Sequence, residues 1–321
     1  MFRLTTPQAN RTRSLFEIVD PVLSEGPIVF DREGCRFRGS NLIVYADTRI
    51  FASSPDITYE YTFEEDDITI GMNFKAVNDA LSCVGPSDSV TFEGTQETLS
   101  AARPYITIRV FNDSNGYSFT SQICLLMLED PELHVPERKF STVVSMASSQ
   151  FLKVLRFLQK KGEYVQIYTR NRKQGVSKTD ALNDETESKT STQYLCFRSE
   201  GDSAKSIYSE KVESDCIEEC LKKERYSLKC LHIISKGTSL CNVVQLFLQV
   251  GDMLALKYRI GTIGSVIFCL SPSCEDAEDV PRLCINESKR KTERTQSSTK
   301  SFKRPVKRAR KKRVVVESQS S

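Results

Sequence analysis

Residues 151–168 show the pattern on which the architecture of the chain depends. The helix-like segment FLKVLRFL (151–158) is followed by Gly162 and by the strand-like run YVQIY (164–168). At about 100° per residue, the apolar side chains of the first segment fall on one face of a helix. Glycine commonly follows a helix because the terminating residue often adopts a left-handed conformation, which costs glycine least. The stretch therefore predicts an amphipathic helix, a stop and a strand.

The same order of helix, glycine and strand occurs four times. The four helix-like segments are Leu15–Leu23, Phe74–Val84, Phe151–Leu158 and Tyr226–Ile234. Because short β-type runs fill the intervals, we predict an α+β fold dominated by antiparallel sheet. The spacing of the four copies predicts an internal duplication with two helices in each half. Extra polar residues at about 170–192 predict an exposed loop insertion.

The charge of the chain is divided between its body and its C-terminal end. Residues 286–321 contain 13 Lys or Arg and three Glu, a charge of +10, so the net charge of +3 leaves −7 on residues 1–285. A tail this basic does not fold alone. We expect a nuclear import signal or a nucleic-acid-binding arm, and therefore a nuclear protein. The candidate residues of this import signal or binding arm are Lys303, Arg304, Lys307, Arg308, Arg310, Lys311, Lys312 and Arg313.

Composition argues against several classes of protein. The eleven cysteines form no CxxC pair, and no apolar run approaches the ~20 residues of a membrane span, so we expect a soluble protein in a reducing compartment. Only His134 and His232 occur, and no phosphate-binding glycine motif is found. The carboxylates at 64–67 directly precede a strand-like run and indicate an exposed turn. We therefore predict no catalytic residues, no metal and no cofactor.

Two of the expected helices carry basic faces opposite their apolar faces. Lysine and arginine on such a face contact phosphates without reading base sequence, so we predict a surface for duplex DNA. The first two helices mix acidic and basic residues, so the surface is expected to be stronger in the second half. The candidate DNA-binding residues are Arg13, Lys75, Lys153, Arg156, Lys160, Lys229 and Lys236.

Several short motifs resemble those of the proliferating cell nuclear antigen family of DNA sliding clamps. Tyr258-Arg259-Ile260, then Gly264 and Phe268-Cys269-Leu270-Ser271-Pro272, is similar to the closing strand of the eukaryotic clamps. Val135-Pro136-Glu137 resembles the end of the connector between the two clamp domains, and Phe74–Gly85 resembles the second clamp helix. The resemblance covers roughly residues 1–275. Because the match to cellular clamps is weak, it favours a divergent or viral lineage.

The resemblance implies a DNA clamp fold of two similar domains, with antiparallel sheets outside and two helices of each domain inside. It divides the chain into a first clamp domain (1–126), an interdomain connector (127–138), a second clamp domain (139–275) and a basic disordered tail (276–321). It also implies a homotrimeric ring whose subunits join edge to edge, through strands near Tyr117–Leu125 and Tyr194–Ser199. Basic helix faces would then line the hole, and acidic residues would face outward.

Clamps of this family bind aromatic-anchored partner peptides in a groove beside the connector. By position, the resemblance implies a groove formed by Val44, Tyr45, Leu133, His134, Val135, Met253, Cys269, Ser271 and Pro272. Met253, Cys269 and the neighbouring Asp47 depart from the usual residues of the family. A partner peptide that departs from the family consensus is therefore expected.

The function implied is that of a non-enzymatic DNA polymerase processivity factor in DNA replication and repair. A ring around duplex DNA, opened by a clamp loader, would tether polymerase and other partners. Three alternatives remain open at this point: a subunit of a heterotrimeric checkpoint clamp, a monomeric or dimeric viral processivity factor of the same fold, and a metal-dependent nuclease using the carboxylates at 64–67.

Overall fold

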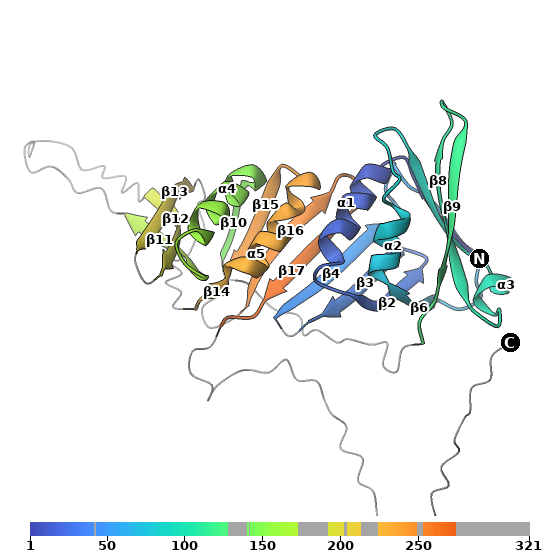
Figure 1. Cartoon of the computed structure of the whole chain (residues 1–321), viewed down its shortest axis with the longest axis horizontal. Helices are drawn as coiled ribbons and strands as arrows, with labels where there is room; N and C mark the ends of the chain where they lie inside the picture. Colours follow the sequence, from blue (N-terminus) through green and yellow to red (C-terminus); the bar gives the residue numbers. More distant parts are fainter. Residues whose placement is uncertain are drawn as a thin grey trace, which may run out of the picture. The chain divides into compact units, whose positions relative to one another are not determined.

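The computed structural model describes most of the body of the chain (Figure 1). The described residues are 1–41, 43–127, 140, 142–172, 192–201, 204–212, 224–248 and 253–273. They belong to one unit, residues 1–277. The predictions for the connector from residue 128 to 138, for residues 173–191 of the insertion and for the tail lie outside the described residues. The division into two clamp domains therefore stays a prediction.

The strands of the described residues form three antiparallel sheets. The five-stranded sheet runs in the order β5 (Thr58–Tyr61), β1 (Phe2–Thr6), β7 (Ser89–Gly94), β8 (Tyr105–Asn112) and β9 (Tyr117–Cys124). The four-stranded sheet runs β13 (Lys205–Val212), β12 (Thr192–Glu200), β11 (Tyr164–Arg172) and β14 (Tyr226–Ser227). The eight-stranded sheet runs β10 (Thr142–Ala147), β15 (Val243–Leu248), β16 (Leu254–Ile260), β17 (Gly264–Leu270), β4 (Val44–Phe51), β3 (Gly34–Ser40), β2 (Glu25–Asp31) and β6 (Asp67–Asn73).

Helices cover one face of the eight-stranded sheet (Figure 1). They are α1 (Ala9–Val19), α2 (Phe74–Ala80), α4 (Ser148–Gln159) and α5 (Leu228–Ile234), which continues into the 3₁₀ turn η1 (Ser235–Ser239). A further short helix, α3 (Gln96–Leu99), lies between β7 and β8. Because α4 packs on α5 and η1, and α1 packs on η1 and α2, the four helices form a continuous row. The antiparallel α+β prediction is confirmed.

Three of the expected helices have wrong boundaries. The second helix ends at Ala80 rather than Val84, and residues 81–83 form a turn. The first helix begins at Ala9 and ends at Val19, and residues 20–23 form the turn that leads into β2. The fourth helix begins at Leu228, because the side chain of Ser227 accepts a hydrogen bond from the Cys230 amide and so caps it. The preceding residues 226–227 pair with β11 as strand β14.

One strand pair joins the two halves of the chain. Residues 44–50 of β4 pair antiparallel with residues 264–270 of β17, although more than 200 positions separate them in the sequence. The pair makes one sheet out of strands from the first quarter of the chain and strands beyond residue 142. Arg11 of α1 adds a second link, since its guanidinium donates to the Leu240 carbonyl at 3.0 Å.

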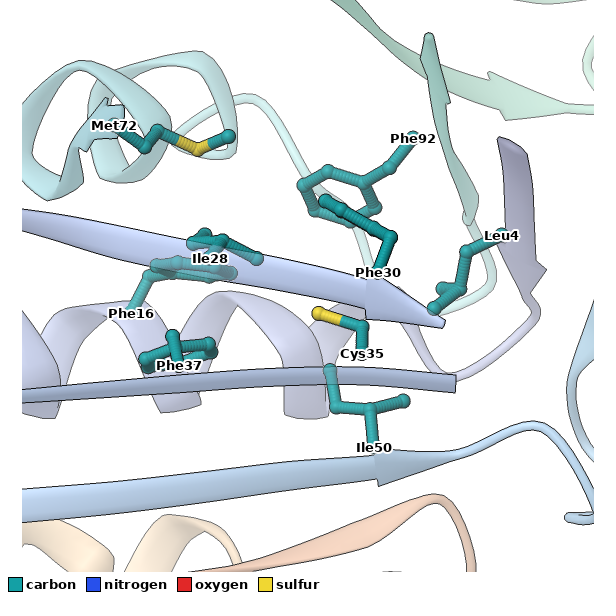
Figure 2. A pocket seen from close by; sticks show the side chains of 9 residues that line it. All are labelled: Leu4, Phe16, Ile28, Phe30, Cys35, Phe37, Ile50, Met72 and Phe92. Carbon is teal, nitrogen blue, oxygen red and sulfur yellow. The ribbon is translucent and has the colours of Figure 1, made fainter. Parts of the chain in front are cut away.

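The apolar core of the first half centres on α1. The ring of Phe16 lies 5.7 Å from that of Phe37, 6.3 Å from that of Phe74 and 6.2 Å from that of Phe92, so one helix residue contacts strands and a second helix. Figure 2 shows the small apolar pocket that Phe16, Phe37, Phe92 and Cys35 help to line, between α1 and the strands. Burial raises the pKa of the Cys35 thiol, so this cysteine packs as a small apolar side chain.

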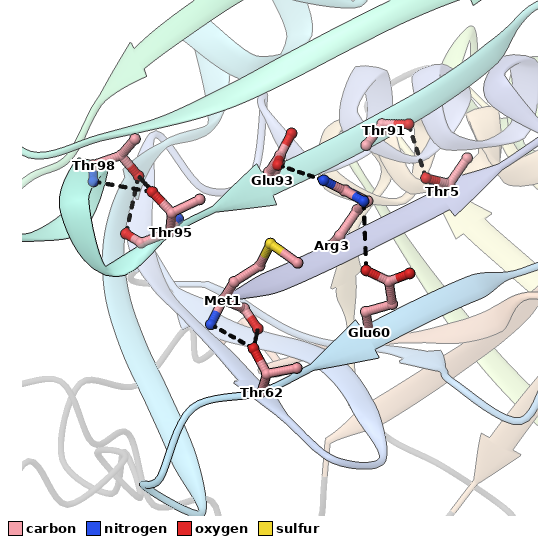
Figure 3. Close-up of polar contacts among 9 residues, drawn as sticks. All are labelled: Met1, Arg3, Thr5, Glu60, Thr62, Thr91, Glu93, Thr95 and Thr98. Atoms are coloured by element: carbon pink, nitrogen blue, oxygen red, sulfur yellow. Dashed lines mark hydrogen bonds and ion pairs between the residues drawn. The ribbon is translucent and has the colours of Figure 1, made fainter.

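Cross-strand polar pairs hold the outer face of the five-stranded sheet (Figure 3). The Arg3 guanidinium on β1 lies 2.9 Å from the Glu93 carboxylate on β7 and 3.5 Å from the Glu60 carboxylate on β5. The hydrogen bond that Arg3 donates to the Glu93 carboxylate raises the pKa of Arg3. The Thr5 and Thr91 hydroxyls bond at 2.9 Å. Two carboxylates around one guanidinium leave this face locally acidic.

We predict that Phe16→Ala destabilises the chain by about 3–5 kcal/mol, because it removes the ring shared by three aromatic neighbours and leaves a cavity. Urea unfolding followed by circular dichroism measures the change, and the denaturant slope should stay unchanged. Phe51→Ala is the control, since that ring is 43% exposed and its loss should cost far less. A change below about 1 kcal/mol for Phe16→Ala would contradict this packing.

Candidate nucleic-acid interface and partner surfaces

The cations expected to contact DNA lie along the helix row. Lys153, Arg156 and Lys160 are exposed on α4 or at its C-cap, Lys229 is exposed on α5, and Lys236 is exposed on η1. Because α4 contacts both α5 and η1, these side chains belong to neighbouring elements of one row. Among the described residues none of the five forms an ion pair. The adjacent Lys161 is also exposed and was missed, because it follows the periodic helix segment.

The first-half helices contribute less positive charge. Arg13 donates to the Glu17 carboxylate at 2.8 Å and to the Val84 carbonyl at 3.3 Å, so α1 partly neutralises its own cation. Lys75 is exposed on α2, one turn before the exposed Asp79. The sequence-based expectation that positive charge would be weaker here agrees with these contacts.

Such a surface suits phosphates rather than bases. Exposed ammonium and guanidinium groups on rigid helices attract phosphate oxygens whatever the base sequence is. The sheet behind the helices fixes the positions of α4 and α5, because Phe151, Val154 and Leu231 are buried in the core. Binding through these groups would weaken steeply as salt rises.

Two eight-residue strands end their sheets with main chain that no described strand pairs. They are β9, next to β8, and β13, next to β12. Large apolar side chains on them are exposed: Phe119 at 50% and Ile207 at 55%. Unpaired strands of this kind are templates for another chain. Residues 194–199 were expected to form a subunit edge, and this expectation is wrong. They belong to β12, which pairs with β11 on one side and with β13 on the other.

A buried carboxylate organises the start of β9. Asp88, only 1% exposed, accepts hydrogen bonds from the Tyr117 hydroxyl at 2.6 Å, the Asn112 amide at 2.8 Å and the Gly85 main-chain amide at 2.8 Å. These bonds, led by that from Tyr117, lower the pKa of Asp88. The Tyr117 ring in turn lies 5.5 Å from that of Phe119. Asp88 therefore holds the exposed aromatic pair of this edge in place.

A small apolar cluster lies on the face of the eight-stranded sheet opposite the helices. Tyr45, Met253, Ala255 and Cys269 are buried together, with Phe140, Phe247 and Ile267 packed around them. Burial raises the pKa of the Tyr45 phenol. We call these seven residues the outer cluster.

The outer cluster contains some of the expected groove residues and not others. Tyr45, Met253 and Cys269 belong to it, and the Ser271 hydroxyl lies 3.8 Å from the Met253 sulfur. Pro272 follows, partly exposed. Val44 does not belong, because alternation along β4 turns it into the main core at 2% exposure. Leu133, His134 and Val135 lie outside the described residues.

The carboxylates at 64–67 show no sign of a metal site. Glu64 to Asp66 are exposed in a bend, and Asp67 begins β6. Across the described parts of the chain no group of three or more His, Cys, Asp or Glu side chains is placed to hold a metal ion. Within the same residues no helix has the length and apolar character needed to cross a membrane.

A continuous antiparallel sheet that joins two halves, with one face covered by a row of basic helices, is the fold of a DNA clamp. The family description "Proliferating cell nuclear antigen, C-terminal domain" matches residues 134–273. The chain is 22% identical over 277 residues to "Probable DNA polymerase sliding clamp 1" of Paramecium bursaria Chlorella virus 1, covering 85% of this chain and 97% of that protein. A "Probable DNA polymerase sliding clamp" of Acanthamoeba polyphaga mimivirus is 21% identical over 211 residues, 65% of this chain and 41% of that protein. The chain is therefore similar to DNA polymerase sliding clamps, with a family match over residues 134–273 and a viral relative that aligns over most of its length.

We predict that Asp88→Ala lowers the free energy of unfolding by about 1–3 kcal/mol at pH 7, because the buried Asn112 amide, the Gly85 main-chain amide and the Tyr117 hydroxyl lose their acceptor. The pKa of Asp88 is lowered by folding, so its contribution is present at neutral pH and is lost as the pH falls below about 3.9 toward that lowered pKa. Denaturant titrations between pH 3 and pH 7 measure the difference. Asp113→Ala, at an exposed position, should change little at any pH.

Proposed function

We propose that this chain is a non-enzymatic DNA polymerase processivity factor that encircles duplex DNA. The observation that supports this most is the set of five exposed cations along α4, α5 and η1, on the helix-covered face of a sheet that joins both halves. The curated viral relatives are named as DNA polymerase sliding clamps. A closed ring cannot leave DNA sideways, so weak contacts to phosphates are enough for it to slide.

The ring is a homotrimer built by adding β13 of one copy to β9 of the next. This addition pairs main chain that is otherwise unpaired and covers Phe119 and Ile207. The flank of α4 above β13 adds apolar surface: Gln150 donates to the Tyr208 hydroxyl at 2.7 Å, and Phe157, two turns further on the same flank, is 49% exposed. Opening this ring around DNA requires a separate clamp loader.

The outer cluster holds the anchor of partner peptides, including that of the polymerase. Tethering converts repeated encounters of the polymerase with DNA into an intramolecular event and raises its effective concentration. The same tether serves repair proteins that carry such peptides. The basic tail directs the chain to the nucleus or adds a contact to DNA.

We predict that Lys153→Glu combined with Lys229→Glu reduces affinity for a 30-base-pair duplex at least tenfold and abolishes stimulation of the polymerase, with unchanged thermal unfolding. Reversing two cations removes phosphate contacts and adds repulsion. Fluorescence anisotropy at several salt concentrations measures binding. Arg103→Glu with Arg109→Glu, exposed positions outside the helix row, is the matched control. Wild-type affinity and stimulation in the helix variant would contradict this surface.

We predict that the full chain has the mass of three subunits in solution and that Phe119→Glu converts it to one subunit, because a carboxylate would be buried in the strand pairing. Light scattering coupled to size exclusion measures both. Phe51→Glu, at a ring on β4 that is 43% exposed, should stay trimeric. A monomeric wild-type chain would exclude the homotrimer and leave a checkpoint-type subunit or a monomeric processivity factor.

A further inference from the structure

The outer face of the eight-stranded sheet is arranged in rows across its central strands. Side chains alternate between the two faces of a strand, so those that do not enter the core point away from the helices. Pairing register then places outer side chains from β3, β4, β17, β16 and β15 side by side, four strands to a row. Three such rows follow one another along the strand direction, each two residues from the next.

The rows differ in chemistry. The first crosses the outer cluster as Tyr45, Cys269, Ala255 and Phe247. The second is Arg38, Asp47, Ile267 and Lys257. The third is Arg36, Arg49, Ser265 and Arg259. We call the second and third rows together the basic strip.

The basic strip carries five cations and one carboxylate. Asp47 lies 3.4 Å from Arg38 and 3.9 Å from Arg49, and Arg36 is 3.9 Å from Asp67 at the start of β6. Within the described residues Lys257 and Arg259 form no ion pair. The expectation of acidic residues facing outward is therefore wrong for these four strands, in contrast to the face around Arg3.

The ion pair inside the strip is incompletely bonded. Nε of Arg38 and Oδ1 of Asp47 are both buried and face each other at 3.4 Å as an ion pair, but neither atom forms a hydrogen bond within the described residues. Buried charged groups without hydrogen bonds are costly, so this pair favours a ligand that supplies polar atoms at the border between the strip and the outer cluster.

We propose that the basic strip binds acidic residues of the partner peptide whose apolar anchor enters the outer cluster. This assignment rests on the proposed function of the outer cluster. Rows two residues apart are about 7 Å apart, so the third row lies about 14 Å from the first. About four residues of extended peptide cover that distance. The partner motif is therefore an apolar anchor with Asp or Glu about three to five residues away.

Charge argues against the other occupants. The chain's own tail carries +10 and is repelled by the strip. The closely spaced phosphates of a nucleic acid would also lie beside Asp47 and be repelled by it. A peptide can instead place its carboxylates at the cations and an apolar side chain in the outer cluster. The sheet also separates the strip from the helix row, so duplex DNA held by the helices does not reach it.

The test selects a phage-displayed library of random dodecapeptides on the full chain. We expect enriched peptides to combine an aromatic or large aliphatic residue with Asp or Glu three to five positions away. Replacing those acids by Asn or Gln in a synthetic copy should weaken binding at least tenfold. Arg49→Glu with Arg259→Glu should weaken the acidic peptide equally and leave the neutral copy unchanged. Arg103→Glu with Arg109→Glu is the charge-matched control.

Two outcomes would overturn the proposal. In the first, the enriched peptides have an apolar anchor and no acidic residues, and they bind the wild-type chain and Arg49→Glu/Arg259→Glu equally well. The outer cluster would then be a peptide site to which the basic strip contributes nothing. Binding of a fluorescent oligo-dT that is lost in that variant and competes with the acidic peptide would make the strip a nucleic-acid site. Duplex binding by the same variant separates these failures from failure of the clamp function, since the helix row is unaltered.

Discussion

The antiparallel pairing of β4 with β17 is the constraint on which the other features depend. It needs close approach of two main chains: a Cβ on Gly264 would lie 2.1 Å from the Arg49 carbonyl oxygen, so only glycine fits there. The turn that leads into β17 contains Gly261 at φ +53°, packed against Gln8 and Arg11 of the first half. One strand pair thus makes the sheet continuous, aligns the helix row on one face and brings Tyr45 beside Cys269 on the other.

Much of this architecture could be predicted from local patterns. The apolar periodicity of residues 151–158 and the glycine that follows fix α4 and its end, since neither depends on distant residues. The cations of α4 and α5 were predicted for the same reason, because a helix face is set by sequence spacing alone. The errors at α1 and α5 come from caps and turns: Ser227 ends a strand and starts a helix, and apolar residues after Val19 pack in a turn rather than in a helix.

Properties that depend on strand register could not be predicted. Arg36, Arg49 and Arg259 become neighbours only through two strand pairings, one of which joins distant parts of the chain, so no sequence window contains the basic strip. Side chains alternate along β4, so Val44 and Tyr45 point to opposite faces of the sheet. A match to a family motif places both residues in the same region and does not say which of them faces the groove. In the same way, the sequence does not show that β12 is an interior strand, because its pairing with β13 becomes known only from the sheet topology.

The two positive surfaces differ in what they can select. The five cations of α4, α5 and η1 have no carboxylate partner among the described residues, so each contact with a repeating polyanion is favourable. In the basic strip Asp47 lies between Arg38 and Arg49, and a closely spaced series of phosphates would meet a like charge there. Separated carboxylates on an extended peptide can avoid it. A chain whose residues 1–285 are negative overall thus carries two positive surfaces on opposite faces of one sheet, and Asp47 is the feature that distinguishes the basic strip from the cations of α4, α5 and η1.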